Sequence, residues 1–77
     1  MPARIVVIEP NVVCLAKPQK HQRRESFYVI RGTVELINGE MNKEMKSGDI
    51  MSFDPYDEHY LTSGPDGVVL YEAIERI

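Results

Sequence analysis

The stretch from His21 to Gly32 constrains the fold of this chain more than any other segment. From Glu25 onward aromatic and β-branched residues predominate, which predicts a β-strand rather than a helix. Successive side chains of such a strand point to opposite faces. Residues an even number apart on a strand point to the same side. Glu25 therefore shares a face with Phe27 and Val29, and His21 joins them if the extended path reaches that far back. Burial of a charged group without a partner is costly, and a metal ion with nitrogen and oxygen ligands would supply a partner.

The rest of the chain has the pattern of short strands separated by turns rich in glycine, proline and asparagine. Besides the strand from Glu25 to Gly32, the predicted strands cover residues 4–8, 12–16, 33–37, 40–46, 50–53, 59–62 and 68–77. Asn38-Gly39 predicts a two-residue hairpin turn, and residues 63–67 predict another turn. The segment from Glu72 onward could instead form a helical turn. Many short strands of this kind predict an all-β fold, a closed or nearly closed antiparallel barrel or sandwich.

The length of the chain predicts one small domain, over residues 1–77, that needs extra stabilisation. A chain of 77 residues buries only about 60–65% of its unfolded surface on folding. Its 43% apolar content is too high for a disordered protein, so a partner subunit, a metal ion or unusually good packing is expected to supply stability. The alternation directs Tyr28 and Ile30 away from the face of Glu25. We therefore predict a homodimer that covers these outward residues.

Composition argues against several classes of function. The single cysteine, Cys14, excludes an intrachain disulfide and lies in an apolar run that favours a structural thiol. The first ten residues lack the basic start and apolar core of a signal peptide, so a cytoplasmic location is predicted. No apolar run is long enough for a membrane span, and a net charge of −3 argues against a nucleic-acid partner. A membrane protein and a nucleic-acid binder are therefore not expected.

A second polar stretch, from Gly48 to His59, completes a resemblance to a known family. The spacing of His21, Glu25 and Gly32 resembles the first motif of the cupins, and Gly48 followed by His59 resembles the second motif. Fifteen residues separate Gly32 from Gly48, about as few as the family uses. The resemblance implies a small single-domain jelly-roll β-barrel.

The same resemblance implies a metal site inside the barrel mouth, with His21, Glu25 and His59 as ligands. The first histidine of the family's motif is replaced by Gln19, which would add a neutral oxygen as a fourth ligand. Such a set suits divalent Fe, Mn, Ni or Zn and does not choose among them. The alternative is that these residues are polar groups on exposed loop ends.

The implied function involves a small molecule. The run from His21 to Thr33 looks like the cupin portion of type II mannose-6-phosphate isomerases, which favours a metal-dependent enzyme acting on a carbohydrate or sugar phosphate. The general base of such an enzyme cannot be named, because Tyr71 and Glu72 lie on opposite faces of the last strand and either could point inward. Arg23 and Arg24 would bind an anionic group such as phosphate, or else belong to a solvated loop.

Two other functions remain open from the sequence. The combination of two histidines and one carboxylate also suits an Fe(II) dioxygenase. A cupin of this size could equally be a non-catalytic module that binds one small ligand, since few residues remain for a lid. The sequence does not decide whether the protein is an enzyme.

Overall fold

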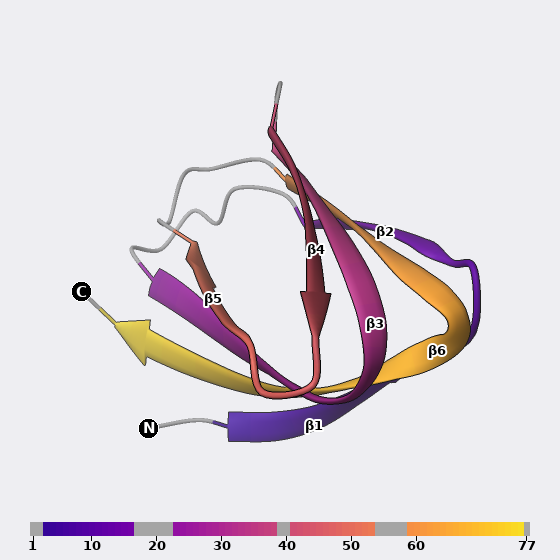
Figure 1. The fold of residues 1–77 in the computed structure, drawn as a ribbon. Helices are drawn as coiled ribbons and strands as arrows, with labels where there is room; N and C mark the ends of the chain where they lie inside the picture. Colours follow the sequence, from indigo (N-terminus) through magenta and orange to yellow (C-terminus); the bar gives the residue numbers. More distant parts are fainter. Residues whose placement is uncertain (1–2, 17–22, 39–40, 54–58, 77) are drawn as a thin grey trace.

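The computed structural model describes residues 3–16, 23–38, 41–53 and 59–76, whose strands form one antiparallel sheet (Figure 1). Its six strands are β1 (Ala3–Ile8), β2 (Val13–Ala16), β3 (Arg23–Asn38), β4 (Met41–Lys46), β5 (Ile50–Phe53) and β6 (His59–Arg76). The hydrogen-bonded order is β1-β6-β3-β4, with β2 also paired to β6 and β5 also paired to β3. Within the described residues no helix is long and apolar enough to cross a membrane. The all-β prediction is confirmed.

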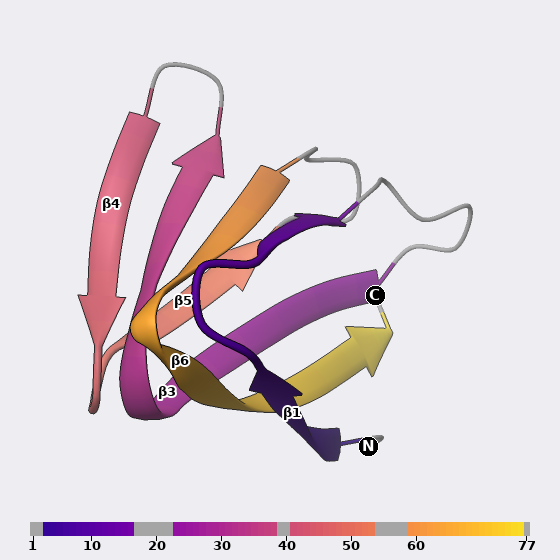
Figure 2. The ribbon, with the colours of Figure 1, turned by 90° about the vertical axis from the view of Figure 1, so that its right-hand side faces the viewer.

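The two long strands, β3 and β6, bend in the middle and so divide the sheet into two halves (Figures 1 and 2). In the first half-sheet, residues 68–76 of β6 and 23–32 of β3 pair with each other and with β1 and β5. In the second half-sheet, residues 59–63 of β6 and 33–38 of β3 pair with each other and with β2 and β4. The halves fold toward each other as in a jelly roll (Figure 1), although the hydrogen-bonded ladder of the six described strands does not close into a ring.

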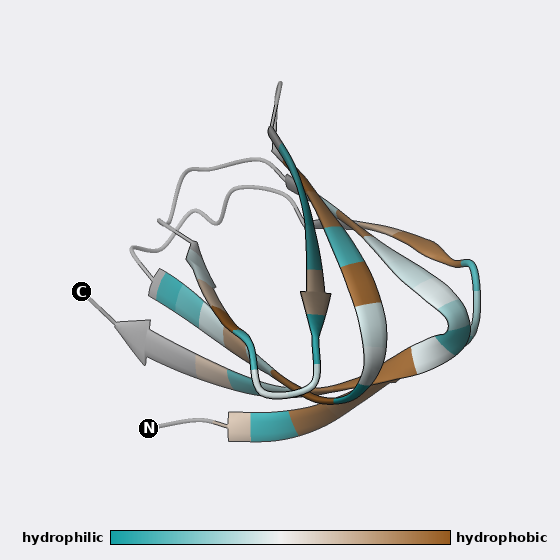
Figure 3. Ribbon diagram, in the orientation of Figure 1, coloured by the Kyte–Doolittle hydropathy of each residue, from teal (hydrophilic) through white to brown (hydrophobic). Residues whose placement is uncertain are grey.

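The core lies between the two half-sheets and follows the predicted alternation. Phe27 and Val29 are buried, whereas Tyr28 and Ile30 are exposed. The buried hydrophobic side chains are Phe27, Val29, Val34, Met45, Met51, Leu61, Val68 and Leu70. Apolar segments recur along β1, β3 and β6 (Figure 3). The partly buried Cys14 packs against this core as a free thiol, in keeping with a structural role.

Bulges at the bend explain a change in which residues of β3 and β6 face the core. In both strands the core-facing residues have odd numbers before the bend and even numbers after it. The register of β3 against β6 shifts between Val29 and Arg31 and again between Gly32 and Val34. An extra residue in one strand reverses the parity of every later side chain. Val34 therefore faces the same interior as Val29, and one strand contributes to both halves of the core.

Several predicted strand boundaries are wrong. The predicted break at Gly32 is absent, because the bulges let β3 turn a corner without ending. The predicted turn at residues 63–67 and the alternative helical turn near the C-terminus are both replaced by one strand, β6. Asn38 pairs with Met41, one residue later than a turn at Asn38-Gly39 requires, and Gly39 itself lies outside the described residues.

A buried serine fixes the connection between β1 and β2 against the bend. The Ser63 hydroxyl donates to the carbonyl oxygen of Glu9 at 2.5 Å and accepts from the backbone N–H of Val12 at 2.8 Å. The backbone N–H of Asn11, a residue with φ of 58°, donates to the Gly64 carbonyl at 3.1 Å. The two bonds of the Ser63 hydroxyl satisfy a polar side chain that would otherwise be costly to bury.

Candidate functional site

Glu25 lies on the inner face of the first half-sheet, as the sequence predicts. It is the third residue of β3, opposite Phe53 of β5 and Ile74 of β6. Its alternate neighbour Phe27 is buried, and Glu25 itself is half-buried. A carboxylate in this position faces the interior close to the end of the strand, where it can meet a ligand that enters from that end.

His59 belongs to the second half-sheet. It is the first residue of β6 and pairs with Ala16 of β2. Two residues later along the same strand, Leu61 is buried in the core. In both views the starts of β3 and β6 lie at the same end of the fold as the ends of β2 and β5 (Figures 1 and 2). The fold thus brings the strand positions of Glu25 and His59 to one mouth from opposite half-sheets.

The remaining predicted site residues are only partly covered by the structure. Gln19 and His21 lie outside the described residues. Arg23 pairs with Arg76, and Arg24 is exposed opposite Glu75. Among the described side chains there is no group of three or more His, Cys, Asp or Glu residues that could hold a metal ion. Of the predicted ligands the structure describes only the side chain of Glu25, a half-buried carboxylate of the kind that divalent transition metals accept as a ligand.

A second inward carboxylate, Glu72, was not placed by the sequence. It is 5% exposed and lies opposite Phe27 on β3 and Arg4 on β1. The Arg4 Nε donates to Glu72 Oε1 at 2.5 Å, although the Arg4 side chain is 70% exposed. Tyr71 points outward, so the choice between the two faces of β6 is settled. Glu72 and Glu25 lie on the same inner face, on neighbouring strands and in adjacent rows.

We expect the Arg4→Met variant to be less stable than the unsubstituted protein by about 1–3 kcal/mol. The exposed arginine gains little from a screened attraction, but its removal leaves the buried carboxylate of Glu72 without this partner. Thermal unfolding should show a fall in Tm of about 4–8 °C for each kcal/mol.

Two further variants isolate the buried charge as the cause. Arg31→Met removes another exposed arginine, from β3, and should change stability by less than about 0.5 kcal/mol. The Arg4→Met, Glu72→Leu double variant removes both charges and should recover most of the loss. Equal stability of Arg4→Met and Arg31→Met would contradict the explanation.

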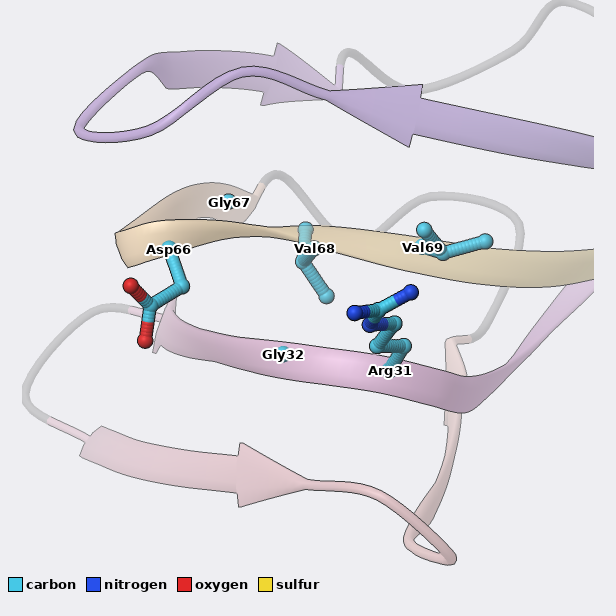
Figure 4. A pocket seen from close by; sticks show the side chains of 6 residues that line it. All are labelled: Arg31, Gly32, Asp66, Gly67, Val68 and Val69. Atoms are coloured by element: carbon cyan, nitrogen blue, oxygen red, sulfur yellow. The ribbon is translucent and has the colours of Figure 1, made fainter.

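A pocket of about 490 Å³ lies at the bend, away from the mouth. Its lining consists of Arg31, Gly32, Asp66, Gly67, Val68 and Val69. Asp66 lies at one end and Arg31 toward the other, with Gly32 and Val68 between them (Figure 4). Of the predicted site residues with described side chains, neither Arg24 nor Glu25 lines this pocket.

The sequence of the chain matches one family of known proteins. A family model described as cupin domain matches residues 4–71. The chain belongs to the cupin family. No curated protein sequence matches this cupin. The cupin prediction is confirmed, whereas the closer likeness to mannose-6-phosphate isomerases stays a prediction.

Solved structures share the fold of this cupin at low sequence identity. The Cupin_2 domain of an XRE family transcriptional regulator from Enterobacter cloacae has a TM-score of 0.85 at 16% identity, over 97% of this chain and 80% of that one. An HTH_3 family transcriptional regulator from Vibrio cholerae has a TM-score of 0.84 at 13% identity, over 97% of this chain and 42% of that one. A predicted oxalate decarboxylase from Thermotoga maritima has a TM-score of 0.80 at 17% identity, over 97% of this chain and 65% of that one. These similarities show the jelly-roll fold.

Proposed function

We propose that this cupin binds a small molecule at a divalent transition metal ion, Fe, Mn, Ni or Zn, in the barrel mouth. Its ligands would be His21, Glu25 and His59, with the neutral amide oxygen of Gln19 as a fourth ligand. The observation that carries the proposal is the inward, half-buried carboxylate of Glu25 at the end of the fold where β6 begins with His59. A small-molecule-binding module also agrees with the cupin domain named in one of the similar regulators.

Charged and apolar residues of the chain would have different roles in binding. The metal ion, when bound, would polarise a carbonyl or hydroxyl oxygen of the ligand. The buried Phe27 and Met51 form an apolar wall one row deeper, which keeps water from the inner end of the site. Arg23 and Arg24, at the start of β3, would attract an anionic group such as phosphate.

The test is elemental analysis of protein purified without a chelator or an affinity tag. After reconstitution with Fe, Mn, Ni or Zn salts and removal of free metal, we expect about one transition metal ion per chain. Protein stripped with a chelator and not reloaded serves as the control. A chain that stays metal-free after all four reconstitutions would contradict the proposal.

A metal-dependent sugar isomerase is the second candidate, and the inward carboxylate of Glu72 favours it. An isomerase needs a base that moves a proton between adjacent carbons, and Glu72 lies on the inner face close to Glu25. Conversion of mannose 6-phosphate to its ketose by the reconstituted protein would establish this activity, and oxygen uptake would instead indicate the dioxygenase alternative. Carbohydrate as the ligand class, one domain over residues 1–77, a homodimer and a cytoplasmic location also stay predictions.

A further inference from the structure

The outer face of the first half-sheet carries an unbroken apolar row across all four strands. The register places Ile5 opposite Tyr71, Tyr71 opposite Tyr28, and Tyr28 opposite Ile50. These side chains are between 42% and 64% exposed. We call this row, Ile5, Tyr71, Tyr28 and Ile50, the outer row.

The rows on either side of the outer row carry one charged residue, the exposed Arg31, which pairs with Val69 beside the bulge. On one side, Val7 is 72% exposed opposite Val69, and Ile30 is exposed on β3. On the other side lie the small residues Ala3, Ala73, Ser26 and Ser52. The six large exposed apolar side chains of this face offer on the order of 600 Å² of surface. That area reaches the upper end of the largest apolar patch on a typical monomer, and with the small residues it approaches the roughly 800 Å² per partner of a stable interface.

The outer face of the second half-sheet provides an internal comparison. Its corresponding row, read across β2, β6, β3 and β4, is Val13, Thr62, Glu35 and Glu44. The two glutamates are exposed and lie directly opposite each other, an arrangement that is stable only in water. One outer face of the same molecule is therefore suited to solvent, whereas the other is suited to burial.

The outer row reads Ile-Tyr-Tyr-Ile in either direction, which suits contact with an identical row. A two-fold axis that runs parallel to the strands, between β3 and β6, would place β1 of one copy over β5 of the other. Ile5 would then meet Ile50, and Tyr71 would meet Tyr28, each contact occurring twice as a closed two-fold interface requires. Sheets pack face to face at about 10 Å, a spacing that these side chains can fill.

We infer that the outer face of the first half-sheet is the interface between two copies of this chain, related by that axis. This inference rests on the homodimer proposed above and adds its face and its orientation. The interface lies on the side of the half-sheet opposite to Glu25, so each copy keeps its own mouth open to ligand. The metal site and the dimer can therefore be tested separately.

The first test is sedimentation equilibrium of the unsubstituted chain and of three variants. The unsubstituted protein should sediment at twice its chain mass of 8.8 kDa at micromolar concentration. Tyr28→Glu and Ile50→Lys should each raise the dimer dissociation constant at least about 100-fold, because they place a charge in the apolar centre. Val13→Lys is the matched control: Val13 and Ile50 are both 64% exposed but lie on different outer faces, and this variant should remain a dimer.

The second test fixes the orientation in a Cys14→Ala background with a short bifunctional maleimide. A mixture of the Ile5→Cys and Ile50→Cys proteins should cross-link, whereas the Ile5→Cys protein alone should not. Cross-linking of the Ile5→Cys protein alone would overturn the proposed axis. If Tyr28→Glu and Ile50→Lys both remained dimers, the proposed face would be wrong although the protein is a dimer. If the unsubstituted protein were a monomer, both the dimer and its proposed face would be wrong. One metal ion per chain in the monomeric variants would show that the proposed function survives either failure.

Discussion

Replacement of Gly32 by alanine should destabilise the protein by about 3–5 kcal/mol, a large share of the stability of a domain this small. Gly32 has a φ of 83°, a conformation that costs an L-residue about 1–2 kcal/mol. A Cβ at this position would also overlap the carbonyl oxygen of Gly67 and come within 3.0 Å of the Cα of Val68. Both contacts are backbone atoms of the paired strand β6, so neither can rotate away.

The matched control for this variant is Gly48→Ala. Gly48 has a φ of 94°, but a Cβ there would meet nothing within 4 Å. Only the conformational cost remains, and Gly48→Ala should lose about 1–2 kcal/mol. Thermal unfolding should show a fall in Tm of about 12–40 °C for Gly32→Ala and about 4–16 °C for Gly48→Ala. Equal losses of stability for the two variants would mean that the close approach of β3 to β6 does not exclude a side chain at position 32.

The strand β3 could be predicted from the sequence because aromatic and β-branched residues predominate in it, and the alternation of an extended chain assigns Phe27 and Val29 to the face of Glu25. Phe27 and Val29 are inside, and the structure buries both. The two glycines of the cupin motifs could also be located, and their positive φ angles supply the physical reason for glycine at each. The strand pattern and the motif spacing together were enough to predict the fold and the strand position of Glu25.

The continuity of β3 and β6 could not be predicted, because glycine and proline normally end strands. In this fold Gly32 lets β3 approach β6 at a bulged corner, and Gly67 lets β6 approach the end of β1, so glycine bends a strand here instead of ending it. The inward direction of Glu72 was hidden for a related reason. Both faces of this part of β6 carry large hydrophobic or aromatic residues, Val69 and Tyr71 on one and Val68 and Leu70 on the other, so only the folded structure identifies the inner face.

Replacement of Glu25 by glutamine should lower the affinity for Ni(II) or Zn(II) at least about 100-fold, which corresponds to about 2.7 kcal/mol. Glutamine keeps an oxygen in the same place but removes the negative charge that offsets the charge of the ion in a partly dry site. His59→Ala removes a donor from the opposite half-sheet, and we expect a loss of similar size. Calorimetric titration of the metal-free proteins measures both effects.

Glu35→Gln separates the loss of a ligand from a general change in charge. Glu35 lies on the same strand, beyond the bend, and is exposed on the outer face opposite Glu44. The variant has the same net charge as Glu25→Gln but should bind metal within about twofold of the unsubstituted protein, because exposed charges at a distance are screened. The Tm of each metal-free variant shows whether it is folded. If folded Glu25→Gln bound metal as tightly as Glu35→Gln, the carboxylate would have to face the interior for packing alone, and the metal site would have to lie elsewhere.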